Sequence, residues 1–567
     1  MAFLVSPHLQ EKDLLTSESF DCYDAFGHGT FQKRLMLLCA LGAFLANSHA
    51  LAFPLISRGV EFKCKQPLPY LNISAAASED GAQLGRCLAY ENPAEPNNSR
   101  TVPCREWDYD DVRAETTVVS AWNLVCQRKL LIAGMSAIQN AGAAIFVLVA
   151  GYVADSVGRV PVLVAATVVL MVSTASSCLS GDYVTHAALK FFSAGSSTLT
   201  MAFSAISLFE VTTHDNRPLH IAVSGTLGLL ASDVLYFFLL QLDFRWELKL
   251  AAFLLPAMML LPAYLTIYES PRWLVAKGQY ARVESVVFAA ANTNRYPLPS
   301  AARLLDKLKA DMCHTAERRS TIVAALLSGF SIRRRALIMC GASFSNTFAL
   351  YVVVFTKQQR STPWVPYIAF FFNLAGYAAM HLLIRKVTML TVITTLFAAL
   401  CVVQCLLILS VVAATESSVV IEALAEVQIA LYYSGGIVSF VYVLELFPTA
   451  MRATAIGWAF ACGRLGAGCA LLSLLLKNAG REQWALLAAE LFLFVSLMTL
   501  RSLPPATSIE CTKMESRRTS LVAKQNIERM KNTLATRSEG SKKSKSSSES
   551  GKSVSTLRGS RRAKAKQ

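Results

Sequence analysis

The chain has 567 residues, of which 54% are hydrophobic and 16% charged, and its mean hydropathy is +0.42. This combination is unusual for a soluble globular protein and predicts a polytopic membrane protein. The net charge of +16 does not indicate a nucleic-acid partner, because residues 501–567 hold seventeen Lys and Arg against five Glu, a net +12, which leaves only +4 on the body of the chain.

Twelve apolar runs are each long enough to cross about 30 Å of hydrocarbon. The predicted spans are 34–54, 130–150, 160–180, 187–209, 219–241, 248–268, 336–356, 364–384, 387–412, 419–444, 453–475 and 482–500. Basic residues mark the cytoplasmic side, so the Arg- and Lys-rich segment 269–335 is predicted to be a cytosolic loop between two six-helix halves, 34–268 and 336–500. An even number of spans leaves both termini in the cytosol, namely residues 1–33 and a basic tail, 501–567, that is predicted to be disordered.

One long polar segment, residues 57–128, separates the first two runs and is predicted to be a large extracellular loop. Its four cysteines predict two disulfides with three possible connectivities. They are Cys64, Cys87, Cys104 and Cys126. The same loop contains sequons at Asn72 and Asn97, which predict N-glycosylation.

The turn between the second and third runs carries charge and glycine, whereas the runs beside it carry almost no charge. It reads Gly-Tyr-Val-Ala-Asp-Ser-Val-Gly-Arg-Val-Pro from Gly151 to Pro161. Asp155 and Arg159 are four residues apart, so they can form a charge pair or cap neighbouring helix ends, and the glycines allow close helix approach. The alternative is an ordinary solvated loop with an incidental charge pair.

This turn resembles the loop between helices 2 and 3 of the major facilitator superfamily, where the motif latches the two halves of a transporter on the cytoplasmic side. Four further segments resemble signatures of the organic cation, anion and zwitterion transporter family within that superfamily. They are Cys104–Asp110, Trp122–Cys126, Glu269–Leu274 and Glu445–Arg452. The resemblance covers about residues 20–500 and implies an all-α membrane protein, with two six-helix halves around a midplane cavity that opens to each side in turn. Related transporters usually carry six cysteines in the loop, so one bridge is missing here.

The resemblance also implies a conformational latch at the inner ends of the helices. Charged residues there are expected to hold one state and to separate on switching, so they bias a two-state equilibrium instead of contacting substrate. The predicted latch residues are Gly151, Asp155, Gly158, Arg159, Glu210, Arg217, Glu269, Arg272, Glu445 and Arg452.

Ionisable residues inside a membrane span are costly, so each invites a functional hypothesis. Arg464 lies in the middle of the eleventh run, where neighbouring glycines allow another helix to pack closely. The alternative is a structural arginine neutralised by a partner carboxylate. In the family that this chain resembles, cation transporters tend to have an acidic residue here and anion or carnitine-type members an arginine. Arg464 therefore favours an organic anion or a zwitterion as the substrate.

An acidic residue inside the fifth run, Asp233, supports the alternative of cation transport. Its carboxylate can bind a cation, pair with Arg464 or take up a proton. Glu422 and Glu426 begin the tenth run, where a solvated helix end near the outer mouth is the expected role. Asn47 in the first run is a further candidate for the cavity lining, although packing with a satisfied hydrogen bond is more common for such a residue.

Aromatic residues in the seventh, eighth and tenth runs are predicted to hold the apolar part of an organic ion. The candidates are Phe344, Phe348, Tyr351, Tyr367, Phe371, Tyr432 and Tyr433. For each of them, packing against another helix or lipid is the alternative. No lysine lies between Pro363 and Arg385, where related anion transporters often carry one, so dianion exchange is less favoured than monoanion or zwitterion transport.

The sequence predicts no enzyme, because it contains no phosphate-binding P-loop, no His-Glu-x-x-His and no Gly-x-Ser-x-Gly elbow. No cofactor and no metal are expected. The expected function is transport of small organic ions across the plasma membrane, with an organic anion or zwitterion favoured and organic cation transport as the alternative. The expected partners are the substrate, the lipid bilayer and a coupling ion or counter-substrate. A non-transporting membrane sensor or scaffold, which would need no intact latch, is the alternative from another class.

Overall fold

The structure is a computed structural model and describes residues 22–65, 86–90, 101–109, 117–296, 330–356, 365–413 and 418–503. Some sequence predictions concern residues outside this part of the chain. They include the glycosylation sites Asn72 and Asn97, the start of the N-terminal segment, residues 297–329 of the central loop, and the basic tail beyond residue 503.

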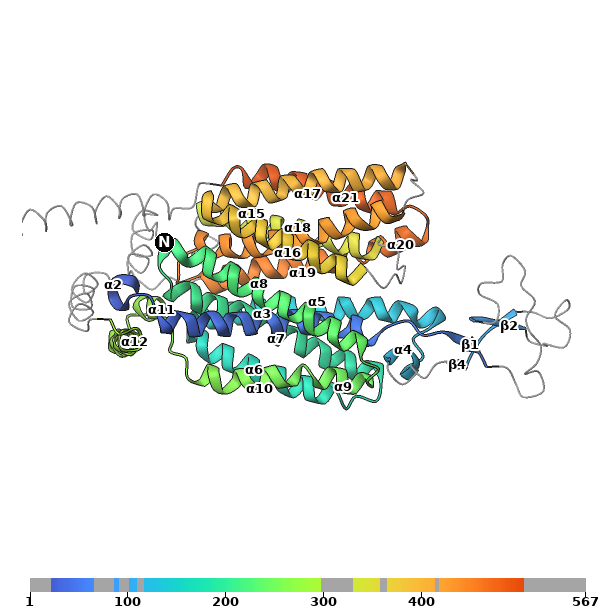
Figure 1. The fold of residues 1–567 in the computed structure, drawn as a ribbon, viewed down its shortest axis with the longest axis horizontal. Helices are drawn as coiled ribbons and strands as arrows, with labels where there is room; N and C mark the ends of the chain where they lie inside the picture. The colour runs from blue at the N-terminus through green and yellow to red at the C-terminus, as the bar shows by residue number, and fades with distance from the viewer. Residues whose placement is uncertain are drawn as a thin grey trace, which may run out of the picture. The chain divides into compact units, whose positions relative to one another are not determined.

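Within the described residues, twelve helical segments are long and apolar enough to cross a membrane, which confirms the twelve predicted spans. In Figure 1 the long helices lie side by side as a bundle. The first half contains α3 (Thr30–Ile56), α5 (Leu130–Val157), α6 (Arg159–Ser177), α7 (Tyr183–Val211), α8 (Arg217–Gln241), and the pair α9 (Trp246–Ala251) and α10 (Leu254–Leu265). The second half contains α15 (Phe330–Thr356), α16 (Val365–Lys386), α17 (Met389–Val412), α18 (Ser418–Leu446), α19 (Arg452–Cys469), α20 (Leu472–Asn478) and α21 (Glu482–Leu500).

The sixth and eleventh spans are each made of two helices, which the hydropathy pattern does not reveal. In the sixth span, Pro256 stands at the third position of α10. A proline has no N–H, so it cannot donate to the carbonyl of Ala252, and α9 and α10 remain separate elements. The eleventh span is interrupted between α19 and α20, just after Gly466 and Gly468, and glycine weakens a helix.

Short helices lie at the end of the bundle where α5 ends and α6 begins, which we call the latch end. They are α2 (Cys22–Phe26), the 3-10 turn η5 (His214–Asn216), α11 (Pro271–Ala276) and α12 (Tyr280–Asn294). Asn294 at the end of α12 donates to the carbonyl of Phe26 at 3.0 Å and accepts from the backbone N–H of Phe31 at 2.9 Å. These bonds hold α12 against α2 and the start of α3.

The segment between α3 and α5 carries the disulfides, so we call that end the disulfide end. Its elements are β1 (Phe62–Cys64), β2 (Leu88–Tyr90), β3 (Thr101–Pro103), β4 (Trp107–Tyr109), α4 (Val118–Ala121) and the 3-10 turn η4 (Cys126–Lys129). Strands β1 and β4 pair antiparallel, with Phe62 opposite Tyr109, and β2 pairs antiparallel with β3, with Leu88 opposite Pro103.

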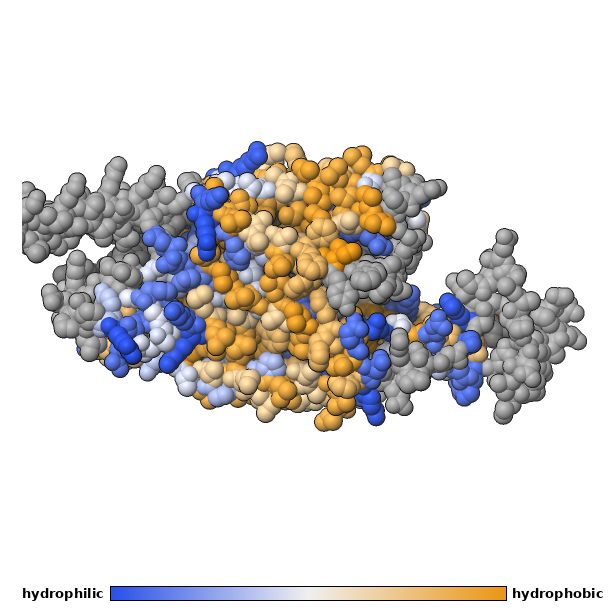
Figure 2. Space-filling view, viewed as in Figure 1, coloured by the Kyte–Doolittle hydropathy of each residue, from blue (hydrophilic) through white to orange (hydrophobic). Residues whose placement is uncertain are grey.

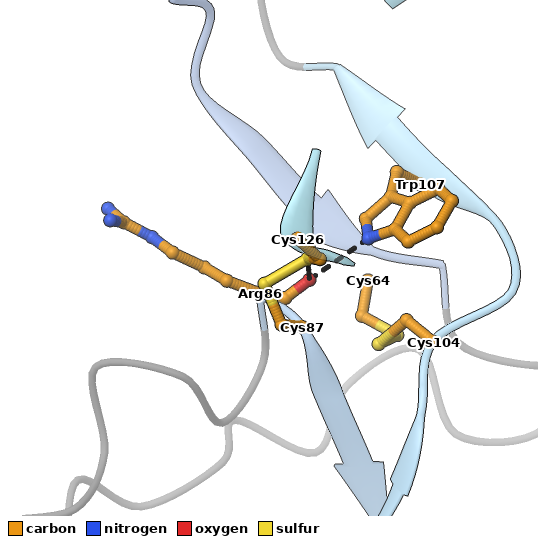
Figure 3. The surroundings of a disulfide bond; sticks show 6 residues. All are labelled: Cys64, Arg86, Cys87, Cys104, Trp107 and Cys126. Atoms are coloured by element: carbon orange, nitrogen blue, oxygen red, sulfur yellow. Dashed lines mark hydrogen bonds between the residues drawn. A yellow bond between two sulfur atoms is a disulfide. The ribbon is translucent and has the colours of Figure 1, made fainter. Parts of the chain in front are cut away.

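The disulfides select one of the three connectivities that the sequence left open. Cys64 bonds to Cys104, and Cys87 bonds to Cys126, with Cα atoms 5.9 and 5.5 Å apart (Figure 3). The second bridge joins Cys87, directly before β2, to Cys126, the first residue of η4, which leads into α5. Beside it, the indole N–H of Trp107 donates to the carbonyl of Arg86 at 3.1 Å.

Glycines bring α5 of the first half and α19 of the second half into backbone contact. A Cβ on Gly151 would lie 2.7 Å from the carbonyl oxygen of Ala453, and one on Gly457 would lie 2.6 Å from that of Val147. Helices can approach this closely only where side chains are absent. Within the second half, Gly463 and Gly466 allow the same approach of α19 to α15, as the sequence predicted for the glycines around Arg464.

The most buried span, α7, is unusually rich in hydroxyl side chains. Asp182 caps its start by accepting from the backbone N–H of Thr185 at 2.9 Å, and this bond holds the pKa of Asp182 below its usual range. The hydroxyls donate to carbonyls three or four residues earlier in the same helix, so these hydroxyls stay hydrogen-bonded although they are buried. They belong to Ser193, Ser196, Ser197, Thr198, Thr200, Ser204 and Ser207.

Large hydrophobic side chains point outward from many of the helices. Figure 2 shows hydrophobic residues covering the middle of the helical bundle. Leu255 is 67% exposed and Met259 is 74% exposed, both on α10. A surface of this kind is unfavourable in water and suits the hydrocarbon of a bilayer, so the chain is a multi-pass membrane protein.

Substituting Gly457 tests the close approach of α5 and α19. Gly457→Ala places a methyl group against the Val147 carbonyl, and overpacking of this kind costs about 1–3 kcal/mol, so the apparent melting temperature of the detergent-purified protein falls. Gly468→Ala, on the same helix with nothing within 4 Å of the new methyl, is the matched control and keeps or raises the melting temperature. Equal melting temperatures for both variants would contradict the packing described.

Candidate functional site

Asp155, at the end of α5, caps the first turn of α19 in the other half of the protein. Its Oδ2 accepts from the backbone N–H of Thr454 at 2.8 Å and from the Thr454 hydroxyl at 2.7 Å, and its Oδ1 accepts from the N–H of Ala453 at 3.4 Å. Asp155 and Arg159 are fully buried and form the predicted charge pair, with 3.2 Å between Oδ1 and Nη2. The alternative of a solvated loop is therefore wrong.

Glu210 at the end of α7 joins arginines from both halves. Its Oε1 lies 3.0 Å from Nη2 of Arg159 and 3.0 Å from Nη1 of Arg452, the first residue of α19. Arg159 also donates to the carbonyl of Thr449 at 2.7 Å, and Arg452 donates to the Thr449 hydroxyl at 2.9 Å. Two carboxylates and two guanidinium groups thus balance one another in a buried network, where charges are tolerated only if paired and hydrogen-bonded.

Glu269 acts as a helix cap. Its carboxylate accepts from the backbone N–H groups of Arg159 and Val160, both at 3.1 Å, so it caps the start of α6. Gly158 has a φ of 126° and passes directly over this carboxylate, where a side chain would collide. The indole of Trp273, on α11, donates to the Asp155 carbonyl at 3.1 Å and lies beneath the Arg159 guanidinium.

The remaining predicted latch residues lie around this network. Arg217 and Arg452 contact the Phe209 ring, with guanidinium carbons 5.0 and 4.8 Å from its centroid. Glu445 lies within electrostatic range of Arg217, and Arg272 on α11 is 3% exposed. Together with Gly151 in the α5–α19 contact, all ten residues therefore gather at the latch end.

A second group of polar residues lies farther from the latch end, at the interface between the two halves. Arg464 on α19 donates through Nη1 to Oδ1 of Asn140 on α5 at 3.2 Å. Asn140 is 5% exposed and donates in turn to the Ser136 carbonyl at 2.8 Å. Among the described residues no carboxylate oxygen lies within 4.0 Å of the Arg464 guanidinium, so the structural alternative of a neutralising carboxylate partner is not seen.

Asp233 on α8 is also held by amides. Its Oδ1 accepts from Nδ2 of Asn47 on α3 at 3.1 Å, and the side chain of Asn373 on α16 lies beside the carboxylate. The Asn47 amide donates to Ser232 as well. Asp233 therefore lies between the two halves, and Asn47, a cavity candidate from the sequence, is one of its direct partners.

Tyrosines lie near these charges. Tyr433 on α18 lies within electrostatic range of Asp233, Tyr351 and Arg464. Tyr377 on α16 is 2% exposed and lies near both Tyr433 and Asp233. We call the group formed by Asp233, Arg464, Tyr351, Tyr433 and their amide partners the seam site. The side chains of those four residues keep partial exposure although they lie between helices.

Four of the predicted aromatic residues lie away from the seam site. Phe344 and Phe348 stack on each other and contact Phe492 of α21, with ring centroids 5.5 and 5.3 Å from it, and Phe492 is 42% exposed on the outside of the bundle. Phe371 is 67% exposed and lines an apolar hollow with Phe370 on α16 and two residues of α8. These three positions favour packing against helices or lipid.

The fourth of these aromatic residues is Tyr432. It is 1% exposed and its hydroxyl lies in a buried network with Gln428 and Gln404, at 2.9 and 3.4 Å, on the side of α18 that faces α17. The side chain of Tyr367 lies outside the described residues.

Sequence reasoning missed several residues that the structure places at these sites. Asn140, Asn373, Thr449 and Thr454 are polar but uncharged, and such residues are too common for a single sequence to single out. Glu426 was expected at a solvated helix end, but it is 4% exposed and lies within electrostatic range of Tyr433.

Lys190 on α7 was detectable as the lysine inside an otherwise uncharged stretch. It is 2% exposed, and its ammonium donates to the carbonyl of His49 at 2.8 Å. No group of three or more His, Cys, Asp or Glu side chains in the described part of the chain is arranged to hold a metal ion.

Comparison with known families gives one match over most of the chain. A family model described as "Sugar (and other) transporter" matches residues 88–499. The "Beta-alanine transporter" of Drosophila melanogaster is 30% identical over 270 residues, 46% of this chain and 43% of the relative. The "Organic cation transporter protein" of the same organism is 24% identical over 57% of this chain and 62% of the relative. The chain thus aligns with less than two thirds of each of these two proteins.

A longer match is found with "Solute carrier family 22 member 7" of Rattus norvegicus, which is 24% identical over 80% of this chain and 89% of the relative. Two solved structures show the same fold. The proton:xylose symporter XylE superposes with a TM-score of 0.60 at 17% identity, covering 84% of this chain and 97% of the symporter. The human organic anion transporter MFSD10 superposes with a TM-score of 0.52 at 13% identity, covering 83% and 100% of the two chains.

Neutralising Glu210 tests the buried network at the latch end. Glu210→Gln leaves two buried arginines with one carboxylate fewer, and breaking a buried pair costs about 3–5 kcal/mol, so the apparent melting temperature falls strongly. The matched control is Glu106→Gln, which removes a carboxylate from an exposed pair with Lys65 and costs about 0–1 kcal/mol. A melting temperature for Glu210→Gln as high as that of the control would argue against the network.

Proposed function

The chain belongs to the family of sugar and other transporters, within the major facilitator superfamily, and on that basis we propose that it carries small organic ions across the membrane by alternating access. The latch supports this proposal. Its ion pairs and caps join α5, α6 and α7 of one half to α19 of the other, so the latch end is closed. A carrier must break such contacts to open toward that side, and their energy sets the balance between two states.

We favour a substrate with a carboxylate, and Arg464 is the observation that carries this choice. Its guanidinium lies within a membrane span, keeps partial exposure, and has an amide and no carboxylate as its hydrogen-bond partner among the described residues. An unneutralised cation at this depth is costly unless an anion joins it. A guanidinium is also the side chain best suited to bind a carboxylate through two parallel hydrogen bonds.

A cation is the alternative substrate. Asp233 presents a carboxylate at the same interface, and the aromatic residues Tyr351 and Tyr433 lie near it, as suits an organic cation. The names of the similar proteins differ in substrate: one is called an organic cation transporter and another a β-alanine transporter. A non-transporting sensor or scaffold is less favoured, because such a protein has no need for the complete latch.

The disulfides support an orientation. Disulfides form in oxidising compartments, so the disulfide end faces the outside of the cell and the latch end faces the cytosol. Twelve spans then leave both termini in the cytosol, and the plasma membrane is the proposed location. A coupling ion or counter-substrate would drive net uptake.

Uptake by cells tests the role of Arg464. We expect a labelled monocarboxylate or carnitine to enter cells that express the protein, and Arg464→Gln to lower this uptake by about tenfold or more at matched surface levels, because a charged hydrogen bond is lost. Labelled tetraethylammonium serves as the cation probe. If its uptake dominates and survives Arg464→Gln, the cation alternative holds and Arg464 is a structural charge.

Latch substitutions are expected to change the rate without changing the choice of substrate. Asp155→Asn weakens the cap of α19, which alters the balance between the two states but touches no atom of the seam site. The maximal uptake rate should fall several-fold, while the ratio of monocarboxylate to tetraethylammonium uptake stays constant. An unchanged maximal rate in variants delivered normally to the cell surface would speak against the latch.

A further inference from the structure

A buried lysine of the first half has a carbonyl as its partner and no acid. Lys190 on α7 is 2% exposed, and its ammonium donates to the carbonyl of His49 on α3 at 2.8 Å. Within the described part of the chain, no carboxylate oxygen lies within 4.0 Å of this ammonium. Buried charges are tolerated when they are paired, as they are at the latch end, so Lys190 requires a counter-charge.

Two histidines lie beside this lysine, where α3 packs against α7. His49 lies opposite Lys190, and one turn farther toward the disulfide end Phe53 lies opposite His186, with ring centroids 6.4 Å apart. Residues four apart share one face of a helix, so His49 and Phe53 face α7 while His186 and Lys190 face α3. His49 is 3% exposed and His186 is 0% exposed.

The histidines add hydrogen-bonding groups that the described residues leave unused. The Nε2 atoms of His49 and His186 are buried without a hydrogen-bond partner among those residues. The Ser180 hydroxyl lies 3.0 Å from Nδ1 of His186, and when it donates to Nδ1 the ring proton is on Nε2. With their protons on Nε2, both imidazoles are donors beside the Lys190 ammonium, which has two further N–H groups of its own.

Aromatic side chains cover these groups from the disulfide end. The indole rings of Trp122 and Trp246 have centroids 5.1 and 6.1 Å from that of the His186 ring. Glu247, which follows Trp246, pairs with Arg245 at 3.1 Å. The site is therefore rich in donors, closed to large molecules and not supplied with an acid by this neighbouring element.

We propose that Lys190, His49 and His186 bind a small inorganic anion of the size of chloride between α3 and α7. The anion neutralises the buried ammonium and accepts from the two imidazoles. Gln139 on α5 also donates to the His49 carbonyl, at 3.0 Å, so the site lies where three helices of the first half meet. The anion is thus a resident ion that stabilises their packing. It is distinct from the proposed cargo, which Arg464 of the second half would bind.

The thermal stability of the detergent-purified full chain tests this site without a transport measurement. Sodium chloride is compared with sodium gluconate at the same sodium concentration, because gluconate is too large to enter. An ion that binds the folded state alone stabilises it, so we expect chloride to raise the apparent melting temperature by about 2 °C or more and in a saturable manner. Bromide, which is nearly as small, should have the same effect.

Substitutions locate the bound ion. Lys190→Met keeps an unbranched side chain and removes the charge, so the rise with chloride disappears, while the melting temperature in gluconate stays the same or increases. His186→Phe keeps an aromatic ring beside the indoles and removes a donor, so about tenfold more chloride is needed for the half-maximal rise. Lys129→Met, at an exposed lysine of η4, is the matched control and keeps the full rise.

Three results would overturn the proposed site. Equal melting temperatures of the wild type in chloride and in gluconate would mean that Lys190 is buried without a bound anion. A rise with chloride that persists in Lys190→Met would place the ion elsewhere in the chain. If Lys190→Met does not fold, an unchanged chloride requirement in His186→Phe serves the same purpose. None of these results bears on organic-ion transport, which the uptake measurements with Arg464→Gln test separately.

Discussion

One carboxylate, that of Glu210, holds together the two halves at the latch end. It lies within 3.0 Å of Arg159 from the first half and of Arg452 from the second, with all three side chains almost fully buried. Buried charges of this kind are tolerated only when they are paired and hydrogen-bonded, and Asp155, Thr449 and backbone carbonyls give the two arginines further partners. Because these side chains are buried, loss of one partner leaves an uncompensated charge, which favours formation and separation of the latch as a unit. That property suits a protein with two states.

The charges at the seam site are arranged differently from those at the latch end. Along the same interface, Asp233 and Arg464 are each held by amides and are not paired with each other. Close approach of α5 and α19 at Gly151 and Gly457 keeps the interface tight on the side of the latch. The protein thus neutralises charge where its halves must hold one another and leaves charge oriented where a ligand would bind. A carrier needs both arrangements, since binding must outweigh the energy of the latch for the halves to move.

Sequence patterns predicted the helices far better than the site. A membrane span requires about 20 apolar residues, which is a local property, so all twelve were found, and only the breaks near Pro256 and Gly468 were missed. The aromatic candidates show the limit. Spacings of three and four placed Phe344 and Phe348 on one face of α15, but that face contacts Phe492 on the outside of the bundle. Periodicity groups residues on a face without telling what the face contacts.

The sequence by itself therefore determined that the chain spans a membrane twelve times and that four cysteines lie in one polar loop, and its resemblance to a known family predicted ten latch residues, which the structure gathers at one end of the helices. These conclusions depend on hydrophobic length and on short motifs, both encoded within neighbouring residues. Only the tertiary structure decided that Cys64 pairs with Cys104, that Asp155 caps α19 almost 300 residues away, and that Asn140 meets Arg464. Such contacts depend on how each helix is rotated and which helix lies beside it, and those are set by the packing of the whole chain.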